Sequence, residues 1–220
     1  MHTNPRKKLS RRSFLASSLR AALFGTYALN ASARTKTPWS NWSGGLSCSP
    51  KGRYDIAAEY QLINLLRETS GPIRPVGSGH SFSPLVPTDG HLIVIDQLSG
   101  VFEHDSQSMQ ATVGAGTRLG DLGAPLFEAG QGMLNLPDID RQTVAGATAT
   151  GTHGTGKNFK SLSGYITGLR LITASGELKD IDASHGDLFD AARVNLGALG
   201  IVTQIRMQNR KSFKLRKREW

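Results

Sequence analysis

The sequence has little that could be cross-linked or could bind a metal. Cys48 is the only cysteine in 220 residues, so no intrachain disulfide can form and no cluster of thiolates can hold a metal ion. We expect a buried, unreactive thiol at this position and no metal site. Long apolar runs are also lacking, because Arg20, Gly25 and several serines interrupt residues 14–29. That run is too short and too polar for a stable membrane span.

The body of the chain lacks an excess of basic residues, although the formal net charge is +9. Residues 1–33 carry six Lys/Arg and no acid, and residues 210–220 carry six Lys/Arg against one acid. Residues 34–209 therefore have 14 basic and 16 acidic side chains, a net charge of −2. A general binder of the phosphate backbone needs a basic face, so we expect no nucleic-acid partner.

The N-terminus has the features of an export signal. A basic head is followed by a modestly apolar run and then by Ala31-Ser32-Ala33, a small-x-small site of the kind that a signal peptidase accepts. Ser10-Arg11-Arg12-Ser13-Phe14-Leu15 closely resembles the twin-arginine export signal. The resemblance implies export in the folded state, commonly with a cofactor already bound, to the periplasm or beyond the cell. The alternative is an ordinary basic amphipathic terminus.

The remainder of the chain predicts a mixture of helices and strands, an α+β fold. Apolar residues recur at helical spacing in 54–69, where Asp55 can cap the start and Gly71 the end. Runs rich in β-branched residues, bounded by turn residues, predict strands and one hairpin. The expected strands are 73–76, 92–96, 110–113, 169–174, 177–181 and 201–207, the further helices are 119–129 and 188–196, and residues 131–156 are expected to form loops.

Three glycine-rich loops suggest a nucleotide-containing ligand, because glycine lets several backbone N–H groups approach one phosphate. Two familiar motifs fit poorly. The run from Gly151 to Lys157 matches the phosphate loop of ATPases, but Asn158 replaces the hydroxyl that binds Mg²⁺ and no buried strand precedes it. The run from Gly114 to Gly120 resembles the GxGxxG dinucleotide motif, but its third glycine is one residue late and no acidic residue ends a second parallel strand.

The third loop, VGSGHSFSPL from Val76, belongs to a more specific combination. Together with residues 135–156 (NLPDIDRQTVAGATATGTHGTG) and 196–205 (LGALGIVTQI), it resembles the FAD-binding domain of the vanillyl-alcohol-oxidase family. The resemblance covers about residues 38–217, with the motifs in the order and spacing of the family, and is closest to the aldonolactone oxidases and alditol oxidase. It implies a two-subdomain α+β fold that binds FAD.

The resemblance also implies a role for His80. In that family a histidine at this position is commonly bonded to the 8α carbon of the flavin ring, which retains the cofactor. The alternative is a histidine that only hydrogen-bonds a turn. Relatives with a second covalent link use a cysteine in the middle loop, and this sequence has none there, so we expect a single bond.

Further FAD-binding residues are implied in the same way. The first loop would cradle the pyrophosphate, the middle segment would line the other side of the cofactor, and Ile201 would lie where relatives pair a backbone group with the adenine. His153 could instead be a structural turn histidine, and the threonines could satisfy only their own loop. The implied set, besides His80, is Val76, Gly77, Ser78, Gly79, Ser81, Asn135, Thr143, Gly146, Thr150, Gly151, Thr152, His153 and Ile201.

The expected organisation has four parts. Residues 1–33 form the signal, 34–53 a connector and 54–217 the FAD-binding domain, and residues 218–220 begin a substrate domain that is otherwise absent. We interpret residues 213–220 as a strand cut in mid-course, so the catalytic residues would lie in the missing domain, which a separate chain could supply. The expected activity is oxidation of a C–OH group of a sugar lactone or polyol, with O₂ or another electron acceptor. The alternative is a flavin-binding module without turnover.

The export hypothesis gives a first prediction. Replacing Arg11→Lys together with Arg12→Lys should leave most of the precursor in the cytoplasm, because the export machinery reads the guanidinium pair and not the charge alone. Cell fractionation and immunoblotting measure the distribution. The control variant Lys7→Arg with Lys8→Arg keeps the same charge and should be exported normally. Normal export of the Arg11/Arg12 variant would refute the hypothesis.

Overall fold

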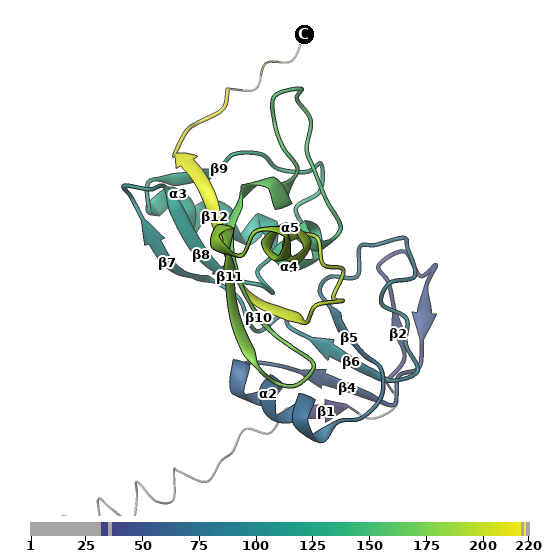
Figure 1. Cartoon of the computed structure of the whole chain (residues 1–220). Helices are drawn as coiled ribbons and strands as arrows, with labels where there is room; N and C mark the ends of the chain where they lie inside the picture. Colours follow the sequence, from purple (N-terminus) through teal and green to yellow (C-terminus); the bar gives the residue numbers. More distant parts are fainter. Residues whose placement is uncertain (1–31, 35–36, 217, 219–220) are drawn as a thin grey trace, which may run out of the picture. The chain divides into compact units, whose positions relative to one another are not determined.

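The computed structural model describes residues 32–34, 37–216 and 218 (Figure 1). Residues 1–31 of the predicted signal (1–33) and two of the three residues expected to begin a substrate domain lie outside the described residues, whereas Ser32 and Ala33 belong to a strand. Residues 31–220 group as one compact unit. Within the described part of this unit, no helix combines the length and the apolar content that crossing a membrane requires.

The first subdomain is built on a small sheet in the order β1-β4-β6-β5. Its strands are β1 (Ser32–Arg34), β4 (Gly52–Asp55), β6 (His91–Val94) and β5 (Ile73–Val76), and helix α2 (Glu59–Glu68) packs beside them. Strand β6 is parallel to both β4 and β5. The carboxyl ends of these three strands therefore lie at one edge, and the glycine loop that follows β5 starts there.

The second subdomain is an antiparallel sheet in the order β11-β10-β12-β8-β7, with β9 also paired to β12. Helices α4 and α5 cover one face of this sheet (Figure 1). Alternating burial along β12 sends Ile201, Thr203, Ile205, Met207 and Asn209 into the core. The elements are β7 (Val101–Asp105), β8 (Gln110–Gly114), β9 (Gln131–Met133), β10 (Ile166–Ile172), β11 (Leu178–Asp182), β12 (Ile201–Lys211), α3 (Gly123–Glu128), α4 (Val144–Ala149), α5 (Asp187–Arg193) and the 3₁₀ turns η1 (Leu119–Leu122), η2 (Leu162–Tyr165) and η3 (Ala183–His185).

The predicted elements are confirmed with shifted ends. The hairpin of β10 and β11 forms as expected, with Leu169 opposite Ile181. Helix α2 begins later than predicted, because Tyr54 and Asp55 belong to β4 and the Gln61 side chain accepts hydrogen bonds from the N–H groups of Ala57 and Ala58. The expected loop of 131–156 contains β9 and α4, and the strand expected from residue 213 onward is absent from residues 213–216.

The stretch predicted as a connector packs into the fold. Strands β2 (Trp39–Ser40) and β3 (Ser47–Cys48) pair with each other, and Trp39 is buried against Val76, Leu92 and Val94. Cys48 lies beside this cluster and is partly buried, whereas a buried thiol was expected. This segment therefore forms part of the first subdomain, because the indole ring covers one face of the small sheet.

A shared core and one polar network join the subdomains. The core cluster combines Ile56, Leu62 and Ile93 of the first subdomain with Ile172 and Ile201 of the second. Beside it, Glu59 of α2 accepts hydrogen bonds from the Thr203 hydroxyl (2.6 Å) and the Gln204 amide (3.1 Å). Arg170 lies 3.7 Å from the other oxygen of Glu59 and donates two hydrogen bonds, of 2.7 and 2.9 Å, to Asp180.

This network gives a prediction on stability. The variant Arg170→Met should lose about 1 kcal/mol of unfolding free energy at pH 7, since the bidentate pair is partly exposed and screened by water. The hydrogen bond from Arg170 holds the pKa of Asp180 below its ordinary value. The stability that the Arg170–Asp180 pair contributes is therefore present above the ordinary pKa of an aspartate, about 3.9. It is lost as the pH falls through the lower pKa that Asp180 has in the folded state.

Urea unfolding of both proteins at pH 7 and near pH 3 measures this difference. The difference in unfolding free energy between wild type and Arg170→Met should be smaller at the acid pH. Lys179→Met is the matched control, because it removes an exposed cation of β11 that contacts only Glu177 at 3.4 Å, and it should change little. A gap of the same size at both pH values would show that the charge pair contributes nothing.

Candidate functional site

The loop of residues 77–81 leaves the end of β5 and approaches the second subdomain very closely. A Cβ atom built on Gly77 would lie 2.0 Å from Oγ1 of Thr143, so no residue other than glycine fits without a shift of one wall. Gly79 has φ +67°, a conformation that side chains rarely adopt, and a Cβ there would lie 3.2 Å from the Trp39 ring. Both glycines are thus required by the tertiary structure.

The opposite wall begins at Thr143, which caps helix α4. Its hydroxyl accepts a hydrogen bond from the N–H of Gly146 at 3.3 Å, and Val144, Ala147 and Thr148 point into the core. Residues 131–156 were predicted to form loops, because glycine and β-branched residues disfavour helix. The threonine cap, followed by buried residues at helical spacing, was the signal that could have identified the helix.

Between these walls lies a cavity of about 650 Å³ to which both subdomains contribute. A volume of this size is typical of a cofactor or drug-sized ligand. The structure brings together on its wall eleven of the fourteen residues that the sequence predicted. These are Val76, Gly77, Ser78, Gly79, His80, Ser81, Thr143, Gly146, Thr150, Thr152 and His153.

The other three predicted residues lie beside the cavity but not on its wall. The Asn135 side chain accepts a hydrogen bond from its neighbour Leu136 at 3.0 Å and supports the turn at Gly154. Ile201 is buried in the core between the subdomains, whereas Gly200 and Val202 on either side of it line the cavity. Gly151, at φ +69°, turns the chain after α4.

Sequence reasoning missed a second group of lining residues at the far end of the cavity. Asn195 is buried, donates to the carbonyl of Ala192 at 2.7 Å and accepts from the N–H of Gly197 at 2.6 Å. This holds Leu196 at φ +53° on the cavity wall. The Asn-Leu-Gly run after a helix was a visible turn signal. The remaining missed lining residues are Trp42, Arg74, Pro75, Phe82, Leu85, Val86, Ile95, Pro137, Asp138, Ile139, Gln142, Ala145, Ala149, Gly200 and Val202.

His80 sits at an aromatic end of the cavity. Its ring centroid lies 5.2 Å from that of Trp42, and Trp42 in turn meets Phe82 edge-on at 6.0 Å. Burial is the main cause that lowers the pKa of His80, and the positive charges of Arg118 and Arg141 lower it further. The imidazole is therefore neutral at pH 7 and retains a lone pair on one ring nitrogen.

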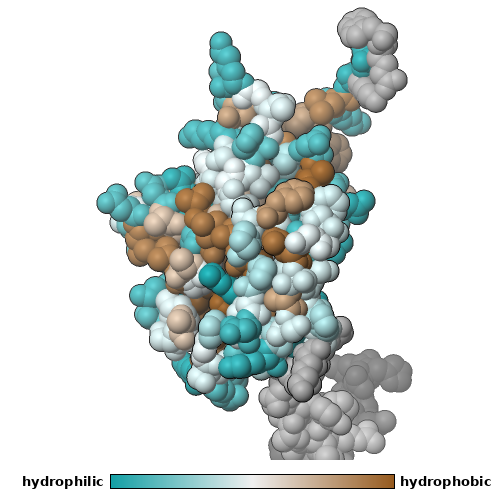
Figure 2. Space-filling model, turned by 90° about the vertical axis from the view of Figure 1, so that its right-hand side faces the viewer, coloured by the Kyte–Doolittle hydropathy of each residue, from teal (hydrophilic) through white to brown (hydrophobic). Residues whose placement is uncertain are grey.

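The surface around the cavity is unusually apolar. Trp42, Phe82, Leu136 and Ile139 are all exposed, and three of them also line the cavity. Figure 2, which views the molecule from one side, shows hydrophobic side chains gathered near the middle of this face with polar side chains around them.

His153 lines the same cavity and has a defined tautomer. Its Nδ1 lies 2.9 Å from the carbonyl oxygen of Gly154. Because a carbonyl only accepts, Nδ1 carries the proton, and Nε2 of the neutral ring is the nitrogen that can accept one.

Several polar groups of the cavity have no partner within the described residues. Ser78 Oγ, His80 Nδ1 and Gln142 Oε1 are enclosed and make no hydrogen bond. Within the described part of the chain, the backbone N–H groups of residues 78–81 likewise have no acceptor. Buried polar groups are normally satisfied, so this row of donors fits a ligand that carries anionic oxygens.

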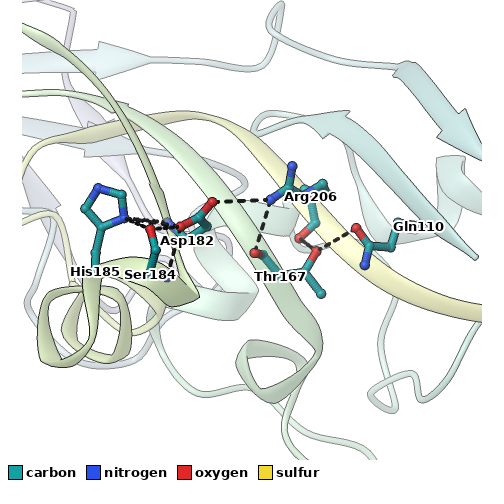
Figure 3. Close-up of polar contacts among 6 residues, drawn as sticks. All are labelled: Gln110, Thr167, Asp182, Ser184, His185 and Arg206. Carbon is teal, nitrogen blue, oxygen red and sulfur yellow. Dashed lines mark hydrogen bonds and ion pairs between the residues drawn. The ribbon is translucent and has the colours of Figure 1, made fainter. Parts of the chain in front are cut away.

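A second cluster, in Figure 3, has the residue types of a hydrolase triad but not its geometry. Ser184 donates to Asp182 at 2.6 Å, and both side chains lie 3.3 Å from the same nitrogen, Nδ1 of His185. A catalytic triad places serine and aspartate on opposite ring nitrogens. The Asp182 side chain also accepts from the Ser184 N–H, so the cluster caps the turn η3, and Arg206 joins it at 3.9 Å from Asp182.

The comparison with known families matches this architecture. Residues 55–182, more than half of the chain, match the FAD-binding domain family, and the chain belongs to it. It is a flavoprotein domain of the vanillyl-alcohol-oxidase type, and its cofactor is FAD. The predicted fold class and cofactor are thereby confirmed.

The proteins that this chain resembles in sequence include oxidases and a dehydrogenase. The chain is 40% identical over 184 residues to L-gulono-1,4-lactone dehydrogenase of Mycobacterium tuberculosis, a match that covers 82% of this chain and 42% of that protein. It is 33% identical to L-gulonolactone oxidase of Mus musculus and 35% identical to D-arabinono-1,4-lactone oxidase of Eremothecium gossypii, over 80% and 76% of this chain and 41% and 33% of theirs. The chain thus spans about two fifths of the length of the first relatives.

A solved structure has the same fold. Cholesterol oxidase of Brevibacterium sterolicum superposes with a TM-score of 0.71 at 20% identity, over 85% of this chain and 39% of that one. At this identity the likeness establishes the fold alone.

The residues of the cavity fit FAD. The unpaired N–H groups of residues 78–81 suit a pyrophosphate, Gly77 lets the loop approach the opposite wall, and the neutral His80 stands at the aromatic end.

The close approach at Gly77 gives a prediction. Gly77→Ala should weaken FAD binding by about tenfold or more, equivalent to about 1.4 kcal/mol, because the added methyl group overlaps the Thr143 hydroxyl and moves the loop. Absorbance titration with FAD measures the affinity. Gly45→Ala, where the new Cβ would have only Ser43 Oγ nearby at 3.5 Å, is the control and should bind normally. Unchanged affinity in Gly77→Ala would contradict the role assigned to this contact.

Proposed function

We propose that this chain is the FAD-binding part of an exported oxidoreductase that oxidises a C–OH group of a sugar lactone or polyol. The support comes from the cavity with its unpaired N–H groups and from similarity to lactone oxidases and a lactone dehydrogenase. FAD, when bound, accepts the two electrons and one hydrogen that leave the alcohol carbon. The electrons pass on to dioxygen or another acceptor.

The chain's own residues bind the cofactor and exclude water from one side of it. Residues 78–81 supply the donors to the pyrophosphate, Thr143 and Gly146 form the facing wall, and the loop at Asn195 closes the far end.

We further propose that His80 bonds covalently to the 8α carbon of FAD. The C–N bond would replace one N–H bond of the His80 imidazole and one C–H bond of the flavin methyl group, and an acceptor such as dioxygen would take up the two electrons and two protons, becoming hydrogen peroxide. The neutral state of His80 supports this reaction, because a protonated ring has no free lone pair.

Export in the folded state by the twin-arginine route is part of the same proposal. The Arg11-Arg12 pair and the small-residue site near Ala33 support it. A cofactor fixed to His80 could not be lost after export. The protein would act on its substrate in the periplasm or outside the cell.

Covalent attachment is tested by precipitating the protein in acid. The unmutated protein should keep its yellow colour in the pellet, and His80→Ala should release the flavin into the supernatant. His153→Ala is the matched control, since it removes the other imidazole of the cavity and should leave the flavin in the pellet. Flavin that washes out of the unmutated protein would refute the bond.

Turnover is tested separately by anaerobic addition of lactones and polyols to the yellow protein. An enzyme loses its absorbance near about 450 nm as the substrate reduces the cofactor. Protein that binds FAD and never bleaches is instead a flavin-binding module, whose substrate groups another chain would supply.

A further inference from the structure

A second cavity, of about 490 Å³, adjoins the same loop. Gly77, Ser78 and His80 line both cavities, so we name residues 77–80 the partition loop. The lining of the first cavity is largely apolar, whereas three arginines and one aspartate line the second.

The charged groups come from four separate segments of the chain. Arg53 belongs to β4, Asp96 follows β6, Arg118 precedes η1 and Arg141 precedes α4. Among the described residues that line this cavity, three guanidinium groups stand against one carboxylate, a net charge of +2 when His80 is neutral. Like charges that the fold gathers in one cavity repel each other unless an anion joins them.

The protein itself provides few partners for these cations. Arg53 Nε is enclosed without a hydrogen bond, and no carboxylate lies within 4 Å of Arg53 or Arg118 among the described residues. Arg141 has only Asp140, at 3.6 Å, and both side chains are largely exposed, so this pair contributes little.

The unsatisfied polar atoms concentrate at this place. Seven enclosed side-chain atoms of the described residues have no partner, and three of them belong to residues that line the second cavity: Arg53 Nε, Ser78 Oγ and His80 Nδ1. In a folded protein such atoms usually contact water, an ion or a ligand.

Asp96 restricts what the anion can be. Partial burial raises the pKa of this carboxyl group, and the charges of Arg118 and Arg53 oppose that rise. An ionised Asp96 would repel a ligand that presents only anionic oxygens, but it would accept hydrogen bonds from hydroxyl groups. The arginines would bind a carboxylate of the ligand, and Asp96 would accept hydrogen bonds from its hydroxyl groups. A small hydroxy-carboxylate carries both kinds of group.

We propose that the cavity of Arg53, Asp96, Arg118 and Arg141 is a binding site for a small hydroxy-carboxylate, separate from the FAD cavity and sharing its partition loop. An aldonate, which a sugar lactone becomes when water opens its ring, has this chemistry. That last identification rests on the proposed function, whereas the site itself does not. Because the loop carries His80, a ligand in this cavity would contact the segment that we propose holds the flavin.

Isothermal titration calorimetry tests the site with gluconate as the probe and with acetate, inorganic phosphate and glycerol for comparison. Gluconate should bind at least tenfold more tightly than acetate or phosphate, and glycerol should not bind. Arg118→Gln should weaken gluconate binding by tenfold or more. Lys179→Gln, which removes an equal charge from the exposed strand β11, should leave it unchanged.

Asp96→Ala distinguishes the ligand classes. Without the carboxylate, acetate and phosphate should bind equally well or better, whereas gluconate should lose its advantage over acetate. Phosphate that binds as tightly as gluconate in the unmutated chain would overturn the hydroxy-carboxylate assignment. Equal effects of Arg118→Gln and Lys179→Gln would overturn the site and leave only a general charge effect.

The titration is repeated with the chain saturated with FAD. Gluconate should still bind, because seven of the ten residues that line the second cavity do not line the first. Loss of binding on FAD saturation would show that the cavity belongs to the FAD site and would overturn the proposal. Failure of the proposed function has a different signature, namely a chain that does not bind or reduce FAD, and gluconate can be titrated in either case.

Discussion

The contact between residue 77 and Thr143 is the constraint on which the site depends. At this point two subdomains approach so closely that no side chain fits, and the chain passes through with only its backbone. The N–H groups that follow have no acceptor among the described residues, which leaves them available to a ligand with anionic oxygens. Close packing and ligand binding are thus consequences of the same missing Cβ.

The approach is stable because the subdomains are joined elsewhere. The shared apolar cluster around Ile93 and Ile172 and the polar network of Glu59, Thr203 and Arg170 fix the helix α2 against the larger sheet. Ile95 of the cluster also lines the cavity, whereas Glu59, Thr203 and Arg170 do not. The cluster and the network hold the first loop and Thr143 at a constant separation, which a cofactor clamped between two walls requires.

Local signals in the sequence were sufficient for some elements and insufficient for others. The strand at Ile73–Val76 and the β10–β11 hairpin were predicted because β-branched residues and turn residues coincide there. Helix α4 was missed because Gly146 and the β-branched residues have low helix propensity, and only burial of Val144 and Ala147 outweighs it. The start of α2 was placed too early, since the apolar spacing continues through Tyr54, which pairs in a parallel strand instead.

The sequence by itself determined the FAD-binding family, the glycine loop with His80 and eleven residues of the cavity wall, because these depend on short motifs in which residue types and spacing carry the chemistry. Only the tertiary structure decided that Trp42 packs against His80, that the Asn195 turn closes the cavity, and that Arg53, Asp96, Arg118 and Arg141 meet beside the loop. These residues come from segments far apart in the chain. Their convergence follows from strand order and subdomain packing, which no local pattern encodes.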